Sequence, residues 1–213
     1  MNRRFLPVAV ATTVSTALLL TGCSSGGGDD DASDKIKGAG GDKDASASAS
    51  APSQPDGSKR PEIKLPKSFQ VQFDGWTSSD PKLQAVMDDG GQQLLSSYAA
   101  IIASDPEAQP MAFYNTGEAL FTGKKWISGF VDKDLTLVGK TRAYKPQARI
   151  SQDGSGTLFY CVDESKASTQ NRKTKKVTKT PADKAQALYR TKLAKSKGIW
   201  QTTSSTTTQG GCQ

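Results

Sequence analysis

Apolar positions in residues 80–213 change their period once, from helical spacing to alternation. Helical spacing covers residues 81–104, where Asp80 suits the N-cap and Pro81 suits the first helical position. Gly90 and Gly91 lie in the middle of that stretch. Each costs about 1 kcal/mol relative to alanine, so the pair predicts a kink or close packing. Two shorter helices are expected next, at residues 111–121 and 124–131.

After residue 134 polar and apolar positions alternate, as they do in strands. The runs Asp153–Gly156 and Lys197-Gly198 are rich in residues that tolerate turns, so each predicts a hairpin. The expected strands are residues 135–138, which are a strand or the start of one, 140–151, 157–163, 173–180, 185–195 and 199–209. Helices followed by antiparallel strands predict an α+β domain at residues 80–213, with the helices on one face of the sheet.

Two segments of different character precede this domain. Residues 63–79 alternate like a strand, with Pro66 interrupting, and we expect an extended arm that packs on the domain. Residues 23–62 are rich in Ser, Gly, Ala and Asp and contain almost no large apolar residue. Such a segment cannot bury enough surface to offset the entropy of ordering. We expect a disordered tether that spans on the order of 35 Å.

The N-terminus has the pattern of a lipoprotein signal peptide, residues 1–22. Arg3 and Arg4 precede an uncharged apolar stretch, which ends in the lipobox Leu20-Thr21-Gly22-Cys23. We expect Cys23 to carry a diacylglyceryl group, and two acyl chains anchor a protein stably. The predicted location is the extracellular face of the cell membrane. An uncleaved N-terminal anchor is the alternative, and a twin-arginine signal is weighed lower because Phe5 directly follows the arginines.

The two other cysteines, Cys161 and Cys212, form an even pair in an oxidising compartment, which predicts one disulfide. It would close a loop of about 50 residues and stabilise the fold by roughly 4 kcal/mol on a chain-entropy model. A metal site is a poor alternative, because the chain contains no histidine and two thiolates do not complete a zinc shell. No cofactor is expected.

Positive charge is concentrated in the domain: residues 80–213 hold 19 Lys and Arg against 12 Asp and Glu. Outside a cell, anionic wall polymers or lipid surfaces are the natural partners of such charge, whereas export makes nucleic acid an unsuitable one. A solvated basic surface without a partner is the favoured explanation of this charge, and binding of such an anionic partner is the alternative. The side chains expected to form a basic face are Lys140, Arg142, Lys173, Lys175, Arg190 and Lys192.

Several short stretches match a known type of protein. They are the Ile63–Pro66 arm with Phe73-x-x-Trp76 and Asp80-Pro81, Tyr114-x-Thr116-Gly117-x-Ala119-Leu120, Cys161-Val162-Asp163-Glu164-Ser165, and Gly198-x-Trp200 with Gly211-Cys212. With these stretches the chain resembles nuclear-transport-factor-2-like proteins, the fold of ketosteroid isomerase and polyketide cyclases. More narrowly, it resembles lipobox lipoproteins of actinobacteria with that fold. The resemblance covers residues 63–212. It implies a cone of three helices on a curved antiparallel sheet, with the two cysteines tying the central strand to the C-terminal tail.

Enzymes of this fold carry out acid–base chemistry with carboxylates, tyrosines or histidine inside the cone. Here histidine is absent, and most acidic residues fall where turns and helix ends are expected. Asp163 with Tyr160 is the candidate acid–base pair, although Asp163 beside Ser165 also suits a turn cap. Aromatic side chains could line an apolar pocket or simply form the core. The pocket candidates are Tyr98, Tyr114, Trp126, Tyr160, Asp163, Tyr189 and Trp200.

The preferred interpretation is a non-catalytic binding or interaction module of the cell envelope. It would present the cone or the basic face to an anionic wall polymer, an apolar ligand or a partner protein. An isomerase- or cyclase-type enzyme that works through a cone carboxylate and a tyrosine is the alternative. No phosphate loop or nucleophile motif supports any other catalytic class.

Overall fold

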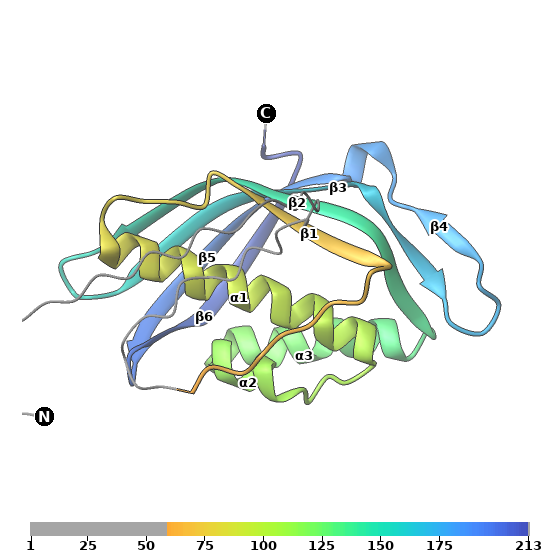
Figure 1. Cartoon of the computed structure of the whole chain (residues 1–213), viewed down its shortest axis with the longest axis horizontal. Coiled ribbons are helices and arrows are strands. Elements are labelled where there is room, and N and C mark those ends of the chain that lie inside the picture. The colour runs from red at the N-terminus through yellow and green to blue at the C-terminus, as the bar shows by residue number, and fades with distance from the viewer. Residues whose placement is uncertain (1–58, 213) are drawn as a thin grey trace, which may run out of the picture. The chain divides into compact units, whose positions relative to one another are not determined.

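A computed structural model describes residues 59–212 of the chain (Figure 1). The predicted signal peptide, Cys23 and nearly all of the predicted tether lie outside the described residues. The elements, in chain order, are β1 (Phe69–Asp74), α1 (Pro81–Ala103), α2 (Gln109–Tyr114), α3 (Gly117–Val131), β2 (Leu135–Ile150), β3 (Gly156–Asn171), β4 (Val177–Lys179), a 3-10 turn (Ala182–Lys184), β5 (Gln186–Ser196) and β6 (Ile199–Gln209).

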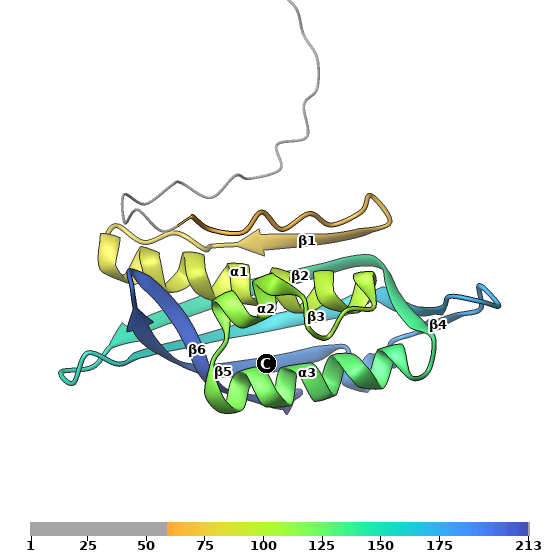
Figure 2. The same ribbon diagram turned by 90° about the horizontal axis from the view of Figure 1, so that it is seen from below.

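The strands form one six-stranded sheet in the order β1-β2-β3-β5-β6, with β4 paired to β3. β1 runs parallel to β2, and the other pairs are antiparallel. All three helices lie on the same face of the sheet (Figures 1 and 2). We call this face the inner face and the opposite one the outer face. The α+β architecture predicted from the change in period is therefore confirmed, and part of the expected arm forms the edge strand β1.

The first helix begins where the sequence predicts. The carboxylate of Asp80 accepts a hydrogen bond from the backbone N–H of Lys82 at 2.8 Å, and Pro81 opens the helix. The glycine pair packs closely: a Cβ at Gly90 would overlap the Leu158 side chain of β3, and one at Gly91 would touch Phe73 and Trp76. Of the two expectations for these glycines, close packing is the one observed.

The break between the second and third helices was predicted at residues 121–124 but lies at Asn115 and Thr116 instead. Asn115 is extended and bridges to Thr202 of β6, and the Thr116 N–H donates to the Thr202 carbonyl at 2.9 Å. Gly117 then enters α3 with a φ of 55°. A pairing with a strand that lies far along the chain therefore sets this boundary.

The strands are longer and fewer than predicted. Residues 135–150 form one strand, and β3 continues beyond Asp163 to Asn171. The expected basic strand at residues 173–180 is reduced to β4, because residues 172–176 form a turn closed by the Asn171 N–H bonded to the Lys176 carbonyl at 2.9 Å. Arg172 in this turn donates to the carbonyls of Ile101 and Ile102 at 2.7 and 2.9 Å, which caps the C-terminus of α1.

The main core lies between α1 and the inner face of the sheet. It includes Val86, Leu94 and Tyr98 of α1 and Leu158, Tyr160 and Val162 of β3. Asp89 is also buried there, 1% exposed, and forms an ion pair with Arg60. The second oxygen of Asp89 accepts from the backbone N–H of Trp200 at 2.8 Å. The chain that enters the domain is thereby fastened to both α1 and β6.

Candidate functional site

The inner face contains one carboxylate among three tyrosines. Glu164 lies within β3, on the same face as Tyr160 and Val162. The Tyr98 hydroxyl of α1 donates a hydrogen bond to Oε1 of Glu164 at 3.1 Å. Tyr160 and Tyr189 stack beside it with ring centroids 5.1 Å apart. We call Tyr98, Tyr160, Glu164 and Tyr189 the inner cluster.

Burial shapes the acid–base properties of the inner cluster. Desolvation raises the pKa of Glu164, and the charge of Asp163 adds to the effect, while the hydrogen bond from Tyr98 opposes it. Desolvation also raises the pKa of Tyr189 to about 12, with the charge of Glu164 contributing. Desolvation, and to a smaller extent the charge of Glu164, also raises the pKa of Tyr98 well above its usual value. A partly buried carboxyl beside a phenol is the kind of pair that acid–base enzymes use.

Aromatic packing fills the space around this cluster. Trp76 stacks edge-on against Tyr160 at 5.3 Å and donates its indole N–H to the Ala143 carbonyl at 3.0 Å. Tyr98 and Tyr160 are 2% and 1% exposed, and Trp200 is 4% exposed. These side chains belong to one continuous core. The inner face at this position is thus occupied by the protein's own side chains.

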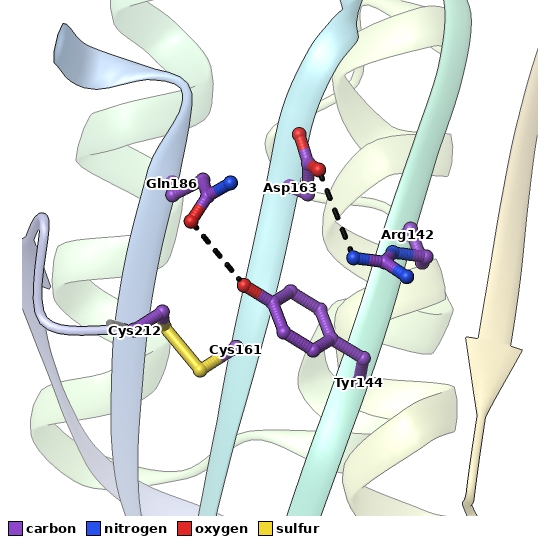
Figure 3. The surroundings of a disulfide bond; sticks show 6 residues. All are labelled: Arg142, Tyr144, Cys161, Asp163, Gln186 and Cys212. Atoms are coloured by element: carbon purple, nitrogen blue, oxygen red, sulfur yellow. Dashed lines mark hydrogen bonds and ion pairs between the residues drawn. A yellow bond between two sulfur atoms is a disulfide. The ribbon is translucent and has the colours of Figure 1, made fainter.

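The candidate acid–base pair of Asp163 with Tyr160, the alternative to a turn cap at Asp163, is not assembled in the structure. Alternate residues of a strand face opposite sides, so positions three apart cannot share a face. Asp163 lies on the outer face, where it is 3.9 Å from the guanidinium of Arg142 (Figure 3). Partial burial acts to raise the pKa of Asp163, but hydrogen bonds from Ser165 and the charge of Arg142 outweigh it and leave the pKa lowered. Its neighbour Glu164, which the sequence analysis did not select, is the inward carboxylate.

The other pocket candidates do not gather around one cavity. Tyr98, Tyr160 and Tyr189 meet in the inner cluster, and Trp200 is buried in the same core. Tyr114 is buried at the end of α2, 1% exposed. Trp126 lies on α3 with 44% of its surface exposed and contacts Phe130 rather than the inner cluster. Core packing therefore explains most of this set.

The outer face carries the disulfide between Cys161 of β3 and Cys212, whose Cα atoms are 5.8 Å apart (Figure 3). The predicted pairing is therefore present. Figure 3 views the sheet with the helices behind it, and the Tyr144 hydroxyl reaches across β3 to the side chain of Gln186 at 3.4 Å. Beside the disulfide lies a shallow pocket of about 320 Å³, lined in part by Lys145, Arg149 and Phe159.

The predicted basic face is only partly assembled. The outer face exposes three of its predicted members, Arg142, Arg190 and Lys192. Lys140 is two residues from Arg142 on β2, so alternation places it on the same face. Lys173 and Lys175 lie instead in the turn between β3 and β4, and Lys173 forms an ion pair with Asp134 at 2.7 Å. Arg142 is paired as well, with Asp74 at 3.5 Å and with Asp163.

Sequence reasoning missed two basic residues, Lys145 and Arg149, that line the outer pocket. The pairing of β2 with β3 slips by one residue between Tyr144 and Gln147, a bulge at which Lys145 has a φ of 52°. The slip puts Arg149 on the same face as Arg142, although simple alternation would place them on opposite faces. Pro146 was the available signal, because proline inside a strand marks an edge or a bulge.

Two kinds of feature are not found among the described residues. Within residues 59–212, no group of three or more His, Cys, Asp or Glu side chains could hold a metal ion. In the same part of the chain, no helix combines the length and the apolar character needed to cross a membrane.

Comparisons with known proteins find similarity in backbone structure and none in sequence families. No protein-family model matches the chain, and no curated protein matches it. The intermembrane space region of chloroplast protein ARC6 is 11% identical with a TM-score of 0.45, over 60% of this chain and 97% of that chain. Aln2 from a Streptomyces species is 13% identical with a TM-score of 0.43, over 62% and 94%. ActVI-ORFA from Streptomyces coelicolor is 12% identical with a TM-score of 0.42, over 60% and 97%. At these values the similarities assign neither a family nor an activity to this chain.

Proposed function

We propose that this chain is a lipid-anchored protein of the cell envelope whose domain binds a ligand through the outer face and is not an enzyme. The observation that carries the proposal is the contrast between the two faces of the sheet. On the inner face, Tyr98, Tyr160 and Trp200 are almost completely buried in one continuous core. The outer face is exposed, basic and indented beside the disulfide.

The proposed family is the nuclear-transport-factor-2-like type that the sequence resembles. The order of three helices followed by a bent antiparallel sheet supports it. A cone serves catalysis when its interior admits a substrate, and ligand sites in general need a concave, accessible space. In this chain Trp76 packs against Tyr160 in the interior, and Trp200 is buried in the same core. The same architecture would then act as a rigid support for the outer face.

The proposed anchor rests on the lipobox that ends at Cys23. A Cys23→Ala chain would lack the thiol that takes the diacylglyceryl group, so we expect it to leave the membrane fraction. Detergent-phase partitioning of the wild type and the variant, together with sensitivity of processing to globomycin, measures this. A Cys23→Ala chain that remains in the membrane fraction would refute lipid anchoring while leaving the binding proposal intact.

A thermal-shift screen tests the binding role, because any ligand that binds only the folded state raises the unfolding midpoint. We propose screening the full chain in detergent against anionic polymers, lipids and small apolar compounds. A shift with an anionic polymer that survives Glu164→Gln supports binding away from the inner cluster. A shift with small apolar compounds that Glu164→Gln abolishes would contradict it.

One observation favours the alternative, an isomerase- or cyclase-type enzyme. Glu164 has a raised pKa and accepts a hydrogen bond from Tyr98, which fits a general base or acid with a phenol partner. If a substrate for proton abstraction were found, Glu164→Gln should remove the activity, while Asp163→Asn on the outer face should leave it intact. Such a result would replace the binding proposal.

A further inference from the structure

We propose that the outer face beside the disulfide binds an anionic, hydroxyl-rich polymer, made of sugar or polyol units that carry carboxylate or phosphate groups. This inference rests on the proposed binding function and names its ligand class and its site. We define the outer basic site by the side chains that build it, which are Lys145, Arg149, Phe159, Arg190 and Lys192 with the Cys161–Cys212 disulfide.

The strand register places four of these side chains, those of Arg149, Phe159, Arg190 and Lys192, in two adjacent rows across the sheet. Arg149 of β2 pairs with Thr157 of β3, which pairs with Lys192 of β5. In the next row, Phe159 of β3 pairs with Arg190. Neighbouring strands are about 4.8 Å apart, so Arg149 and Lys192 stand roughly 10 Å apart on either side of β3. An extended anionic chain that crosses the strands could contact both cations at once.

The positive charge of this site is not neutralised by the acidic residues that the structure describes. Within residues 59–212, the acidic side chains that form ion pairs do so with other cations, among them Arg142, Lys124 and Lys173. None of these described acids pairs with a cation of the outer basic site, whose members are Lys145, Arg149, Arg190 and Lys192. Cations gathered on one face without acidic partners attract a polyanion and lose that attraction as salt is added.

The pocket gives this charge a defined shape. Its volume of about 320 Å³ is close to the lower end of ordinary ligand sites, which suits a single ring or polyol unit of a polymer. Lys145 and Arg149 supply charge at the pocket, and Phe159 supplies an apolar surface on which such a unit can lie. The guanidinium of Arg190 is 5.4 Å from the Phe159 ring centroid, which holds this cation next to the pocket.

The chemistry of the surrounding surface favours a hydroxyl-rich ligand over a lipid surface. The large apolar side chains that are most exposed, Phe121, Trp126 and Val177, lie on α3 and β4 and not at this site. The edge strand β6 instead brings hydroxyls next to the cations: Ser204 pairs with Lys192 and Thr206 with Arg190. Hydroxyl and ammonium groups bind polar, charged chains, whereas an interfacial membrane site needs an apolar surface to insert.

The test uses the full chain in detergent micelles and three defined polymers. Polygalacturonate carries carboxylates, poly(glycerol phosphate) carries phosphates, and dextran is neutral. Titration calorimetry should detect binding of at least one acidic polymer at low salt, weakening as salt is added, and no binding of dextran. The tighter of the two acidic polymers identifies the preferred anionic group.

Two double variants with the same loss of charge locate the site. Lys145→Gln with Lys192→Gln removes two cations of the outer basic site. Lys82→Gln with Lys133→Gln removes two exposed lysines elsewhere. We expect the first pair to weaken binding about tenfold, which corresponds to a loss of about 1.4 kcal/mol for the two contacts together. The control pair should change binding less than twofold. Equal weakening by both pairs would overturn the site, because diffuse net charge would then account for the binding.

The remaining outcomes separate this inference from the proposed function. If no acidic polymer binds but another envelope component shifts the unfolding midpoint without dependence on Glu164, the ligand class is wrong and the binding role stands. If dextran binds as tightly as the acidic polymers, the charged site is wrong. If neither polymer nor any other ligand binds and a Glu164-dependent turnover is found, the proposed function fails together with the inference.

Discussion

The hydroxyl of Tyr98 on α1 donates a hydrogen bond to the carboxylate of Glu164 on β3, across 3.1 Å. It is a direct polar link between the helical layer and the sheet, next to a largely apolar core. Replacing Tyr98 with Phe keeps the ring and removes the donor. We expect the free energy of unfolding to fall by about 1 kcal/mol, measured by urea denaturation.

Tyr144→Phe is the matched control for that variant. Its hydroxyl is on the exposed outer face and meets Gln186 at 3.4 Å, a long contact. We expect almost no change in stability from it. An equal loss of unfolding free energy in both variants would show that the Tyr98–Glu164 hydrogen bond contributes no more to stability than an exposed one.

The raised pKa of Glu164 predicts a pH dependence. An acid with a raised pKa in the folded state keeps its proton there more readily than in the unfolded state, so stability falls as pH rises from the ordinary glutamate pKa of about 4.3 to the folded value. Glu164→Gln cannot lose a proton, and its stability relative to wild type should rise across that window. Asp88 and Asp89, whose pKa values burial also raises, are unchanged in both proteins and cancel in the difference.

Denaturation midpoints of the wild type and Glu164→Gln between pH 4 and pH 8 measure this difference. Asp163→Asn should behave in the opposite way, because the pKa of Asp163 is lowered. Its stability relative to wild type should fall as pH rises toward the ordinary aspartate pKa of about 3.9, so the midpoints of this variant are measured below pH 4. The same sign for both variants would contradict the placement of the two carboxylates on opposite faces.

The disulfide closes a sequence separation of 51 residues. Reduction, or a Cys161→Ala and Cys212→Ala double variant, should lower the free energy of unfolding by about 4 kcal/mol on the chain-entropy model. Thermal unfolding with and without reductant measures the loss. Mass spectrometry under non-reducing conditions is the control, and two thiols free to alkylate in the untreated protein would disprove the bond.

The glycines of α1 and α3 should respond oppositely to alanine. A Cβ at Gly90 would overlap Leu158, which is fully buried, so Gly90→Ala should destabilise the domain by about 1 kcal/mol or more despite the better helix propensity. A Cβ at Gly129 meets nothing within 4 Å. Gly129→Ala should therefore stabilise α3 by up to about 1 kcal/mol. Thermal midpoints of the two variants decide this, and stabilisation by Gly90→Ala would refute the close approach.

Local signals were sufficient for several elements. The start of α1 at Asp80 and Pro81 depends on a cap and a fixed φ, and the turn at Lys197-Gly198 depends on residues that adopt positive φ. Both are properties of a few adjacent residues. Cysteine arithmetic likewise identified the disulfide, because only two thiols remained once Cys23 was assigned to lipid.

The boundaries and faces that the sequence did not show depend on distant partners. The end of α2 is set by Thr202, whose carbonyl accepts from Thr116. The position of Arg149 on the outer face depends on a bulge in the pairing of β2 with β3. The inward position of Glu164 needs no distant partner, because Glu164 and Tyr160 are four residues apart on one strand and alternation places them on the same face.

The ion pair between Arg60 and Asp89 determines how the domain would carry a mechanical load. Tension on the N-terminal chain reaches the folded part first at Arg60, which holds α1 through Asp89, while Asp89 in turn holds the backbone of β6. The load therefore reaches α1 through Asp89 before it reaches β1. β1 lies at the edge of the sheet and pairs only with β2. Until that pair separates, pulling cannot unzip β1 one hydrogen bond at a time. Arg60 acts as a clamp that shields this edge strand from force.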